Sequence, residues 1–246
     1  MELLCEQQFL DYVKLPFKNS ISIYFSLEEK HFDALESLNI YSLTFYEEPK
    51  VTSRKICLKK VKILTIVFPN KQFQDFFSCN SIIKTLIIHG NIHKHQYPTT
   101  NSLQLFNIPS SKQFGQVFLD NLPPCITELH INSCDVGGKL DFLPESIKIL
   151  CFLYCQNLYL ENLPKSITNL FIKSKHYIFF SHYKNSLPPN LEFFHTNCII
   201  DTEPFLPKTV NCLKWQKTGS LSITEMEEKI KKCNPTIKEV YCYYKN

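Results

Sequence analysis

The sequence predicts a β-rich α/β solenoid, a stack of short similar units that share one curved, parallel β-sheet. Two observations indicate this fold. Leu-Pro-x-x followed by an apolar residue recurs at intervals of 21, 20, 24 and 19 residues. Each copy then continues with alternating apolar and polar residues, as in the Ile-Thr-Glu-Leu-His-Ile of residues 126–131, which is typical of a half-buried strand. Units of this length bury a common core by stacking on their neighbours.

The register of the units is given by the first apolar residue after Leu-Pro-x-x, which we expect to face the core. In residues 122–218 this register mark is occupied by Ile126, Ile147, Ile167, Leu191 and Val210. Weaker copies without Leu-Pro place further marks at Val61, Ile83, Leu103, near Leu38 and near Ile21, and a displaced last copy at Ile237. Each unit therefore contributes one strand, which follows its mark.

The Leu-Pro slot argues against a helix between the strands. Seven of the fourteen prolines lie in these slots, and proline fixes φ and lacks the N–H that a helix interior needs. About 20 residues also leave little room for a helix once a strand and two turns are subtracted. We therefore expect a convex side that is extended, with short 3₁₀ turns.

A solenoid exposes apolar surface at both ends and needs caps. In residues 1–35 the apolar side chains from Leu3 to Val13 have near-helical spacing, which predicts a helical N-terminal cap. In residues 219–246 two pairs, Ser222 with Glu225 and Thr224 with Glu227, have capping-box spacing, which predicts a short helix and then a last strand. With repeats over 36–218, residues 1–246 form a single domain, and the insertion at 174–185 is expected to protrude as a loop.

These units resemble those of leucine-rich-repeat proteins, in particular the short class with Leu-Pro-x-Ser-Ile or Leu-Pro-x-x-Leu, which includes FNIP repeats and the LPX-type repeats of bacterial effectors. The resemblance implies that Cys134 and Cys155, eight residues after their marks, bond the backbone of a turn. It also implies a module that binds another protein on its concave sheet. Related repeat proteins are often attached to F-box or ligase domains, so a substrate-recognition subunit is the alternative.

Composition restricts the compartment and the partner. The chain of 246 residues has no signal-peptide pattern at its start and no apolar run near the roughly 20 residues of a membrane span, so we expect a cytoplasmic protein without a membrane partner. Eleven cysteines, an odd number without a CxxC pair, are then expected to be reduced. Only Arg54 supplies a guanidinium group for bidentate recognition, so a nucleic-acid partner is not expected.

Two groups of residues leave an enzyme or a metal-binding protein open as less favoured alternatives. His89, His93 and His95 could ligate zinc or titrate near neutral pH, but no acidic residue lies near them in sequence. His130 and Cys151 would lie on neighbouring strands, yet a nucleophile needs an activated thiolate and a pocket, whereas a solenoid sheet is open. We expect no catalysis, no cofactor and no metal.

The outward residues of the strands define the candidate site. The row nearest the middle of the strands is predicted to contain Thr65, Ile87, Asn107, His130, Cys151, Phe171, His195 and Lys214. The next row contains Val67, His89, Pro109, Asn132, Leu153, Lys173, Asn197 and Gln216. Neither row contains an acidic residue, and the mixture of aromatic, amide and basic groups suits a protein or a partly acidic peptide. The partner-binding candidates are His130, Asn132, Cys151, Leu153, Phe171, Lys173, His195 and Asn197, on a chain expected to be monomeric, with the loop at 174–185 as the other candidate surface.

Overall fold

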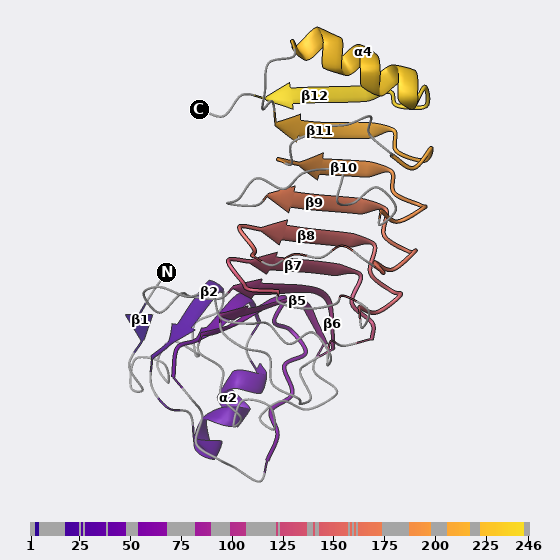
Figure 1. The fold of residues 1–246 in the computed structure, drawn as a ribbon. Coiled ribbons are helices and arrows are strands. Elements are labelled where there is room, and N and C mark those ends of the chain that lie inside the picture. The colour runs from indigo at the N-terminus through magenta and orange to yellow at the C-terminus, as the bar shows by residue number, and fades with distance from the viewer. Residues whose placement is uncertain are drawn as a thin grey trace. The chain divides into compact units, whose positions relative to one another are not determined.

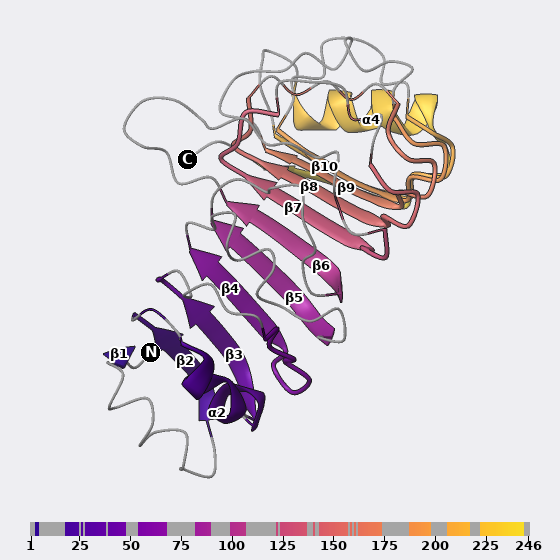
Figure 2. The same cartoon turned by 90° about the horizontal axis from the view of Figure 1, so that it is seen from below.

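The structure is a computed structural model of the chain, and it describes residues 3–4, 18–24, 26, 28–37, 39–47, 54–67, 82–89, 99–106, 122, 124–136, 140, 143–156, 158, 160, 162–173, 187–197, 206–216 and 222–243. The chain divides into two compact units, residues 1–126 and residues 127–246. In both units the strands are parallel and follow one another in sequence order (Figures 1 and 2).

The first unit contains six strands within the described residues. They are β1 (Leu3–Leu4), β2 (Lys18–Ile23), β3 (Ile40–Phe45), β4 (Ile63–Val67), β5 (Ile82–His89) and β6 (Thr99–Phe106). A 3₁₀ turn, η1 (Glu29–His31), and the helix α2 (Phe32–Ser37) connect β2 to β3. Leu43, Leu64, Leu86 and Leu103 are paired from strand to strand and are at most 1% exposed, so they form a continuous ladder in the core.

The second unit repeats this arrangement with β7 (Glu128–Asn132), β8 (Ile149–Leu153), β9 (Asn169–Lys173), β10 (Phe193–Thr196), β11 (Cys212–Gln216) and β12 (Glu239–Tyr243). The helix α4 (Ile223–Cys233) precedes β12 and lies next to it in Figure 1. Ser222 and Glu225 form the predicted capping box, and Met226 and Ile230 are the buried residues of the helix. The parallel, β-rich solenoid predicted from the sequence is thus confirmed in each unit.

The recurrent Leu-Pro has a direct structural role in the second unit. The carbonyl oxygens of Pro144, Pro164, Pro188 and Pro207 each accept a hydrogen bond from the N–H of the register mark three residues later, at 3.0 to 3.3 Å. All five marks from Ile126 to Val210 are fully buried. Proline presets the φ that such a turn needs at no cost in hydrogen bonds, because its missing N–H is not used there. In the last repeat Asn234 supplies the carbonyl, and its side chain donates to Pro207 O at 2.9 Å.

Cys134 and Cys155 fix the turns that follow β7 and β8. Cys134 Sγ donates to Asn132 O at 3.1 Å, and Cys155 Sγ donates to Ile131 O at 3.3 Å. The residue before each cysteine has a left-handed backbone, with φ of 54° at Ser133 and 57° at Tyr154. Each thiol therefore donates to a backbone carbonyl at the end of β7, directly after a residue with a left-handed backbone. This confirms the role in turn formation that the resemblance implied.

The register of the first unit differs from the prediction at the weakest repeats. Leu103 pairs with Leu86 and Ile21 pairs with Leu43, so both lie three residues after the mark position. In the repeat of β6 the mark itself is Thr100, which pairs with Ile83 and is 1% exposed. The hydroxyl of Thr100 donates to Ser102 O at 2.8 Å, and this bond lets a polar residue replace the apolar one.

The observed pairing also gives the mark of β3 and the outward position of β6. Ile40, 3% exposed, takes the mark position of β3, whereas Leu38 lies outside the described residues. The middle outward row then passes through Gln104, because Gln104 pairs with Ile87. Asn107 and Pro109, which were predicted for the two outward rows, lie outside the part of the chain that the structure describes.

The start of the chain also differs from the prediction where it is described. Leu3 and Leu4, placed by their spacing in a helical cap, form the strand β1 and pair with Ser22 and Ile23. Residues 5–17 lie outside the described residues, as does the insertion at 174–185. Within the described residues of this unit the α-helix is α2, in the connection between β2 and β3. That connection contains no proline, so the restriction that argues against a helix in the Leu-Pro connections does not apply to it.

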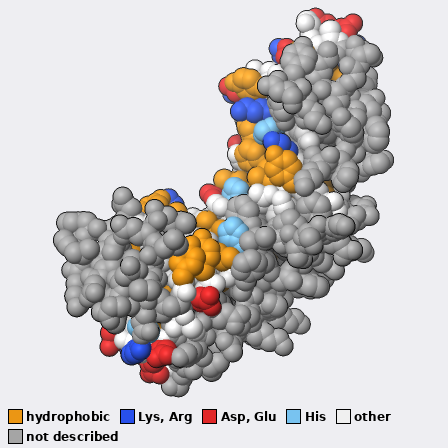
Figure 3. Space-filling model, turned by 90° about the vertical axis from the view of Figure 1, so that its left-hand side faces the viewer, with side chains coloured by type: hydrophobic (Ala, Val, Ile, Leu, Met, Phe, Trp, Pro, Cys, Tyr) orange, Lys and Arg blue, Asp and Glu red, His pale blue; other side chains and the backbone are white. Residues whose placement is uncertain are grey.

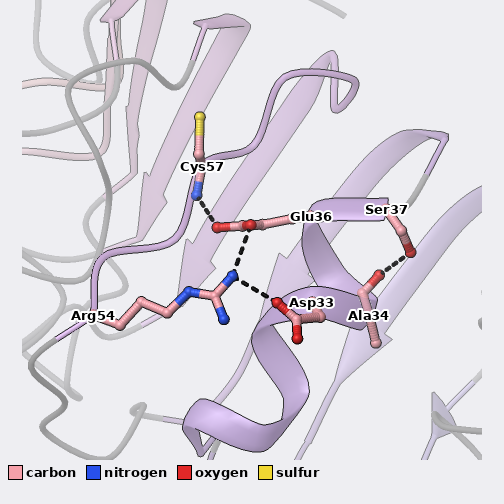
Figure 4. A network of polar contacts seen from close by, with 6 residues as sticks. All are labelled: Asp33, Ala34, Glu36, Ser37, Arg54 and Cys57. Atoms are coloured by element: carbon pink, nitrogen blue, oxygen red, sulfur yellow. Dashed lines mark hydrogen bonds and ion pairs between the residues drawn. The ribbon is translucent and has the colours of Figure 1, made fainter.

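The only arginine of the chain holds α2 to the segment that leads into β4 (Figure 4). Arg54 Nη2 lies 2.7 Å from Asp33 Oδ1 and 2.9 Å from Glu36 Oε2, both on α2. The other carboxylate oxygen of Glu36 accepts the backbone N–H of Cys57 at 2.9 Å. Because one carboxylate bonds a guanidinium and a backbone amide, the network fixes the helix relative to this segment. Arg54 is therefore structural.

Candidate functional site: the sheet face of strands β7 to β12

The outward face of the second unit consists of three rows of side chains that run across the strands. The first row contains Glu128, Ile149, Asn169, Phe193, Cys212 and Glu239. The middle row contains His130, Cys151, Phe171, His195, Lys214 and Tyr241. The third row contains Asn132, Leu153 and Lys173, and Asn197 follows β10 beside them. Side chains of one row lie on neighbouring strands about 4.8 Å apart.

The structure brings all eight predicted partner-binding residues onto this one face. Seven are half-buried or exposed, but Cys151 is only 6% exposed between its neighbours His130 and Phe171. The sequence analysis did not include the first row. Residues two positions apart on a strand lie on the same face, so counting two residues back from the middle row would have found it. That row contributes two carboxylates, Glu128 and Glu239, so the face does contain acidic groups.

Five side chains on β9 to β12, which we call the aromatic–lysine cluster, are linked by a series of pairwise contacts. They are Phe171, Phe193, His195, Lys214 and Tyr241. The ring centroids of Phe171 and Phe193 are 5.1 Å apart, and those of Phe171 and His195 are 6.0 Å apart in an edge-on arrangement. These distances are in the range where aromatic pairs attract beyond their simple burial, so the rings support one another.

The two lysines of the face lie over aromatic rings. Lys214 Nζ is 5.5 Å from the centroid of Phe193 and 5.2 Å from that of Tyr241. Lys173 Nζ is 5.1 Å from the centroid of Tyr154, which follows β8. An ammonium group at such distances is attracted by the negative face of a ring. Figure 3 shows basic and histidine side chains beside hydrophobic ones in the upper part of the view.

The carboxylates lie on the outermost strands of the unit. Glu128 Oε2 on β7 is 3.9 Å from His130 Nε2, and Glu239 Oε2 on β12 accepts a hydrogen bond from the hydroxyl of Tyr241 at 3.1 Å. Within the described part of β8, β9, β10 and β11, no outward position of the three rows is acidic. The face is therefore basic and aromatic at its centre and acidic at both sides.

Both histidines of the face favour the neutral form. Burial lowers the pKa of His195, and the positive charges of Lys214 and Lys173 lower it further. Burial also lowers the pKa of His130, although Glu128 acts in the opposite direction. Near neutral pH the positive charge at the centre of the face is therefore that of the two lysines.

Replacing Lys214 by methionine is expected to raise the pKa of His195, because one of the two positive charges that disfavour its protonated form is removed. The change is read by following the imidazole signals of His195 by NMR as the pH is lowered. Lys208→Met is the control, since Lys208 is exposed on the turn before β11 and is not among the groups that act on His195. An unchanged pKa in Lys214→Met would contradict the placement of Lys214 beside His195.

The alternative chemistry finds little support in the described geometry. His130 and Cys151 are paired on neighbouring strands, as predicted, but burial raises the pKa of the Cys151 thiol to about 11. Such a thiol is almost entirely protonated at neutral pH and is a poor nucleophile. His89 is half-buried at the end of β5, whereas His93 and His95 lie outside the described residues. No group of three His, Cys, Asp or Glu within the described ranges is placed to hold a metal ion.

The repeated strand, the Pro-x-x turn and the buried ladder define a parallel β-solenoid in each unit. No model of a protein family matches the chain, and no curated protein matches it. A solved structure with some similarity is described as "the crystal structure of CroV588 a novel circular LRR protein structure". It is 18% identical with a TM-score of 0.33, and the match covers 85% of this chain and 40% of that one. None of the helices that the structure describes has the length and hydropathy needed to cross a membrane.

Proposed function

We propose that the chain is a protein-interaction module that binds a segment of another protein on the sheet face of β7 to β12 and performs no catalysis. The observation that carries this proposal is the aromatic–lysine cluster. Phe171, Phe193, His195 and Lys214 are only half-buried, and Tyr241 is 49% exposed, so a partner can reach them. Aromatic side chains at the centre of a contact surface tend to contribute most of the binding energy.

We further propose that the module acts as a monomer in the cytoplasm, without a cofactor. The described cysteines Cys151, Cys155 and Cys212 are thiols and not disulfides, which supports a reducing compartment. Burial raises the pKa of each of these three thiols, so they stay protonated near neutral pH and are poor nucleophiles.

Phe171→Ala is expected to weaken the binding of the partner by about 30-fold, which corresponds to about 2 kcal/mol for an aromatic anchor. The partner is first captured on the wild-type chain, and its affinity for each variant is then measured by calorimetry. Tyr41→Ala is the matched control, because Tyr41 is an aromatic residue of the first unit that is 54% exposed and lies outside the proposed face. It should bind as the wild type does.

The melting temperature of each variant separates a loss of binding from a loss of folding. Both variants remove a partly or largely exposed side chain, and such changes are expected to alter stability by no more than about 1 kcal/mol. If Phe171→Ala binds as tightly as the wild type, while deletion of residues 174–185 abolishes binding, the insertion and not the sheet face is the binding surface.

A further inference from the structure

The position of Lys214 indicates what kind of partner the face recognises. Its ammonium group lies over the rings of Phe193 and Tyr241, which come from β10 and β12, the two strands that flank β11. None of the ion pairs formed among the described residues involves Lys214. Among the described residues, therefore, aromatic rings and not a carboxylate lie against this ammonium group.

The charges around Lys214 favour an anion at the same place. Lys173 lies on β9, and both lysines act on His195 between them. The nearest acidic residue of the face, Glu239, is on β12, where its carboxylate accepts the hydroxyl of Tyr241. Two positive charges without an acidic side chain between them attract a negatively charged group of a partner, and a wrong partner with a positive charge is rejected.

An apolar surface lies directly beside this charge. Phe171 and Phe193 are in contact, and the half-buried Ile149 and Leu153 continue the surface onto β8. Phe171 and Lys214 are two strands apart, or about 10 Å. An extended peptide rises about 3.3 Å per residue, so a segment that crosses the strands spans this distance in about two to four residues.

We infer that the partner segment is an extended acidic peptide in which an Asp or Glu pairs with Lys214 and an apolar side chain about two to four residues away packs on Phe171 and Phe193. This inference rests on the proposed function and specifies the chemistry of the same face. The apolar side chain of the peptide contributes affinity by burying surface against the rings. The carboxylate fixes the direction and position of the peptide on the face.

The inference is tested with a display library of random seven-residue peptides, selected in parallel on the wild-type chain and on two variants. Lys214→Glu reverses the charge at the face. Lys208→Glu makes the same chemical change on the turn before β11 and is the matched control. On the wild type and on Lys208→Glu, the enriched peptides should contain Asp or Glu within four positions of a large apolar residue. On Lys214→Glu this preference should disappear, and Lys or Arg should replace the acid.

One selected acidic peptide is then synthesised, and its affinity is measured for the wild type, for Lys214→Met and for Phe171→Ala. We expect a loss of about tenfold or more in Lys214→Met, together with a weaker dependence on salt, because the paired charge is gone. A charge-free variant of similar shape is used because a glutamate at 214 could disturb Tyr241. The melting temperatures of all the variants are recorded alongside.

The outcomes distinguish the inference from the proposed function. Peptides that need Phe171 but show no preference for acids, or bind Lys214→Met as they bind the wild type, overturn the inference and leave the proposed function standing. Peptides that bind Phe171→Ala as tightly as the wild type, or a selection that enriches no peptide at all, count against the proposed function and remove the basis of the inference.

Discussion

Leu170→Asp is expected to lower the free energy of unfolding by about 4 kcal/mol or more, enough to unfold much of the second unit at room temperature. Leu170 is fully buried in β9 and is paired with Leu150 on β8 and with Phe194 on β10. A carboxylate at this position would lie in the core between two repeats without a partner. In a solenoid each repeat contacts only its neighbours, so a fault in one repeat weakens both interfaces that it forms.

The matched control is Asn169→Asp, one residue earlier on the same strand. Asn169 points outward and is half-buried, so the new charge remains near water and the unfolding free energy should change by less than about 1 kcal/mol. Both variants are measured by urea denaturation followed by circular dichroism. A Leu170→Asp protein that unfolds at the same urea concentration as Asn169→Asp would mean that the inward and outward faces of β9 are reversed.

The second unit could be predicted in detail because its sequence repeats the same signal. Each Leu-Pro fixes the position of a turn, and the turn fixes which of the following residues face the core. Once the mark of a repeat is known, the direction of each following strand residue is known too. Phe171, Cys151 and His195 each lie four residues after their marks, so their pairing was predictable. The helix α4 was equally predictable, since Ser222 and Glu225 form a capping box from residues close in sequence.

The first unit was harder because the marks at Ile40, Val61, Ile83 and Thr100 have no proline three residues before them, and not all of these marks are apolar. Thr100 occupies a core position only because its hydroxyl finds a backbone acceptor, and no hydrophobic pattern reveals such a bond. The predicted mark, Leu103, lies three residues after the observed mark, Thr100. Both positions face the core and are apolar in most repeats, so the apolar pattern alone does not distinguish them. The network of Arg54 with Asp33 and Glu36 is likewise invisible in the sequence, because its members are 18 or more residues apart.

The sequence predicted that the candidate residues share one face of the sheet, but it did not predict the charge of that face; their role in binding stays a prediction. The two rows considered from the sequence contain no acid, whereas the first row, with Glu128 and Glu239, sets the limits of the basic region. The burial of Cys151 was also missed, because an outward position on a strand is covered when both neighbours are large. Large side chains on neighbouring strands touch one another. The alternation of apolar and polar residues predicts which face of the sheet a side chain lies on, but not which neighbours cover it.

Raising the pH from about 9 to above 11 is expected to remove about 3 to 5 kcal/mol of stability through Cys151 and Cys155 alone. Burial raises the pKa of both thiols from 9.0 to about 11, and the charge of Cys155 adds to the effect on Cys151. The native protein therefore keeps protons that the unfolded chain loses. The contribution of each thiol is fully present below pH 9 and is lost as the pH rises through 11. A native pKa that lies one pH unit above the unfolded value corresponds to about 1.4 kcal/mol.

The measurement is the unfolding free energy in urea, with a reductant present, at several pH values from about 8 to about 11.5, on both sides of the thiol titration. Lysines and tyrosines titrate in the same range, so the informative quantity is the difference in slope between the wild type and the double variant Cys151→Ala with Cys155→Ala. The double variant should start less stable, because Cys155 bonds the turn after β8, but it should lose less stability with rising pH. Cys233→Ala, at the exposed end of α4, should keep the slope of the wild type. Parallel slopes in the wild type and the double variant would show that the two thiols reach solvent in the native protein.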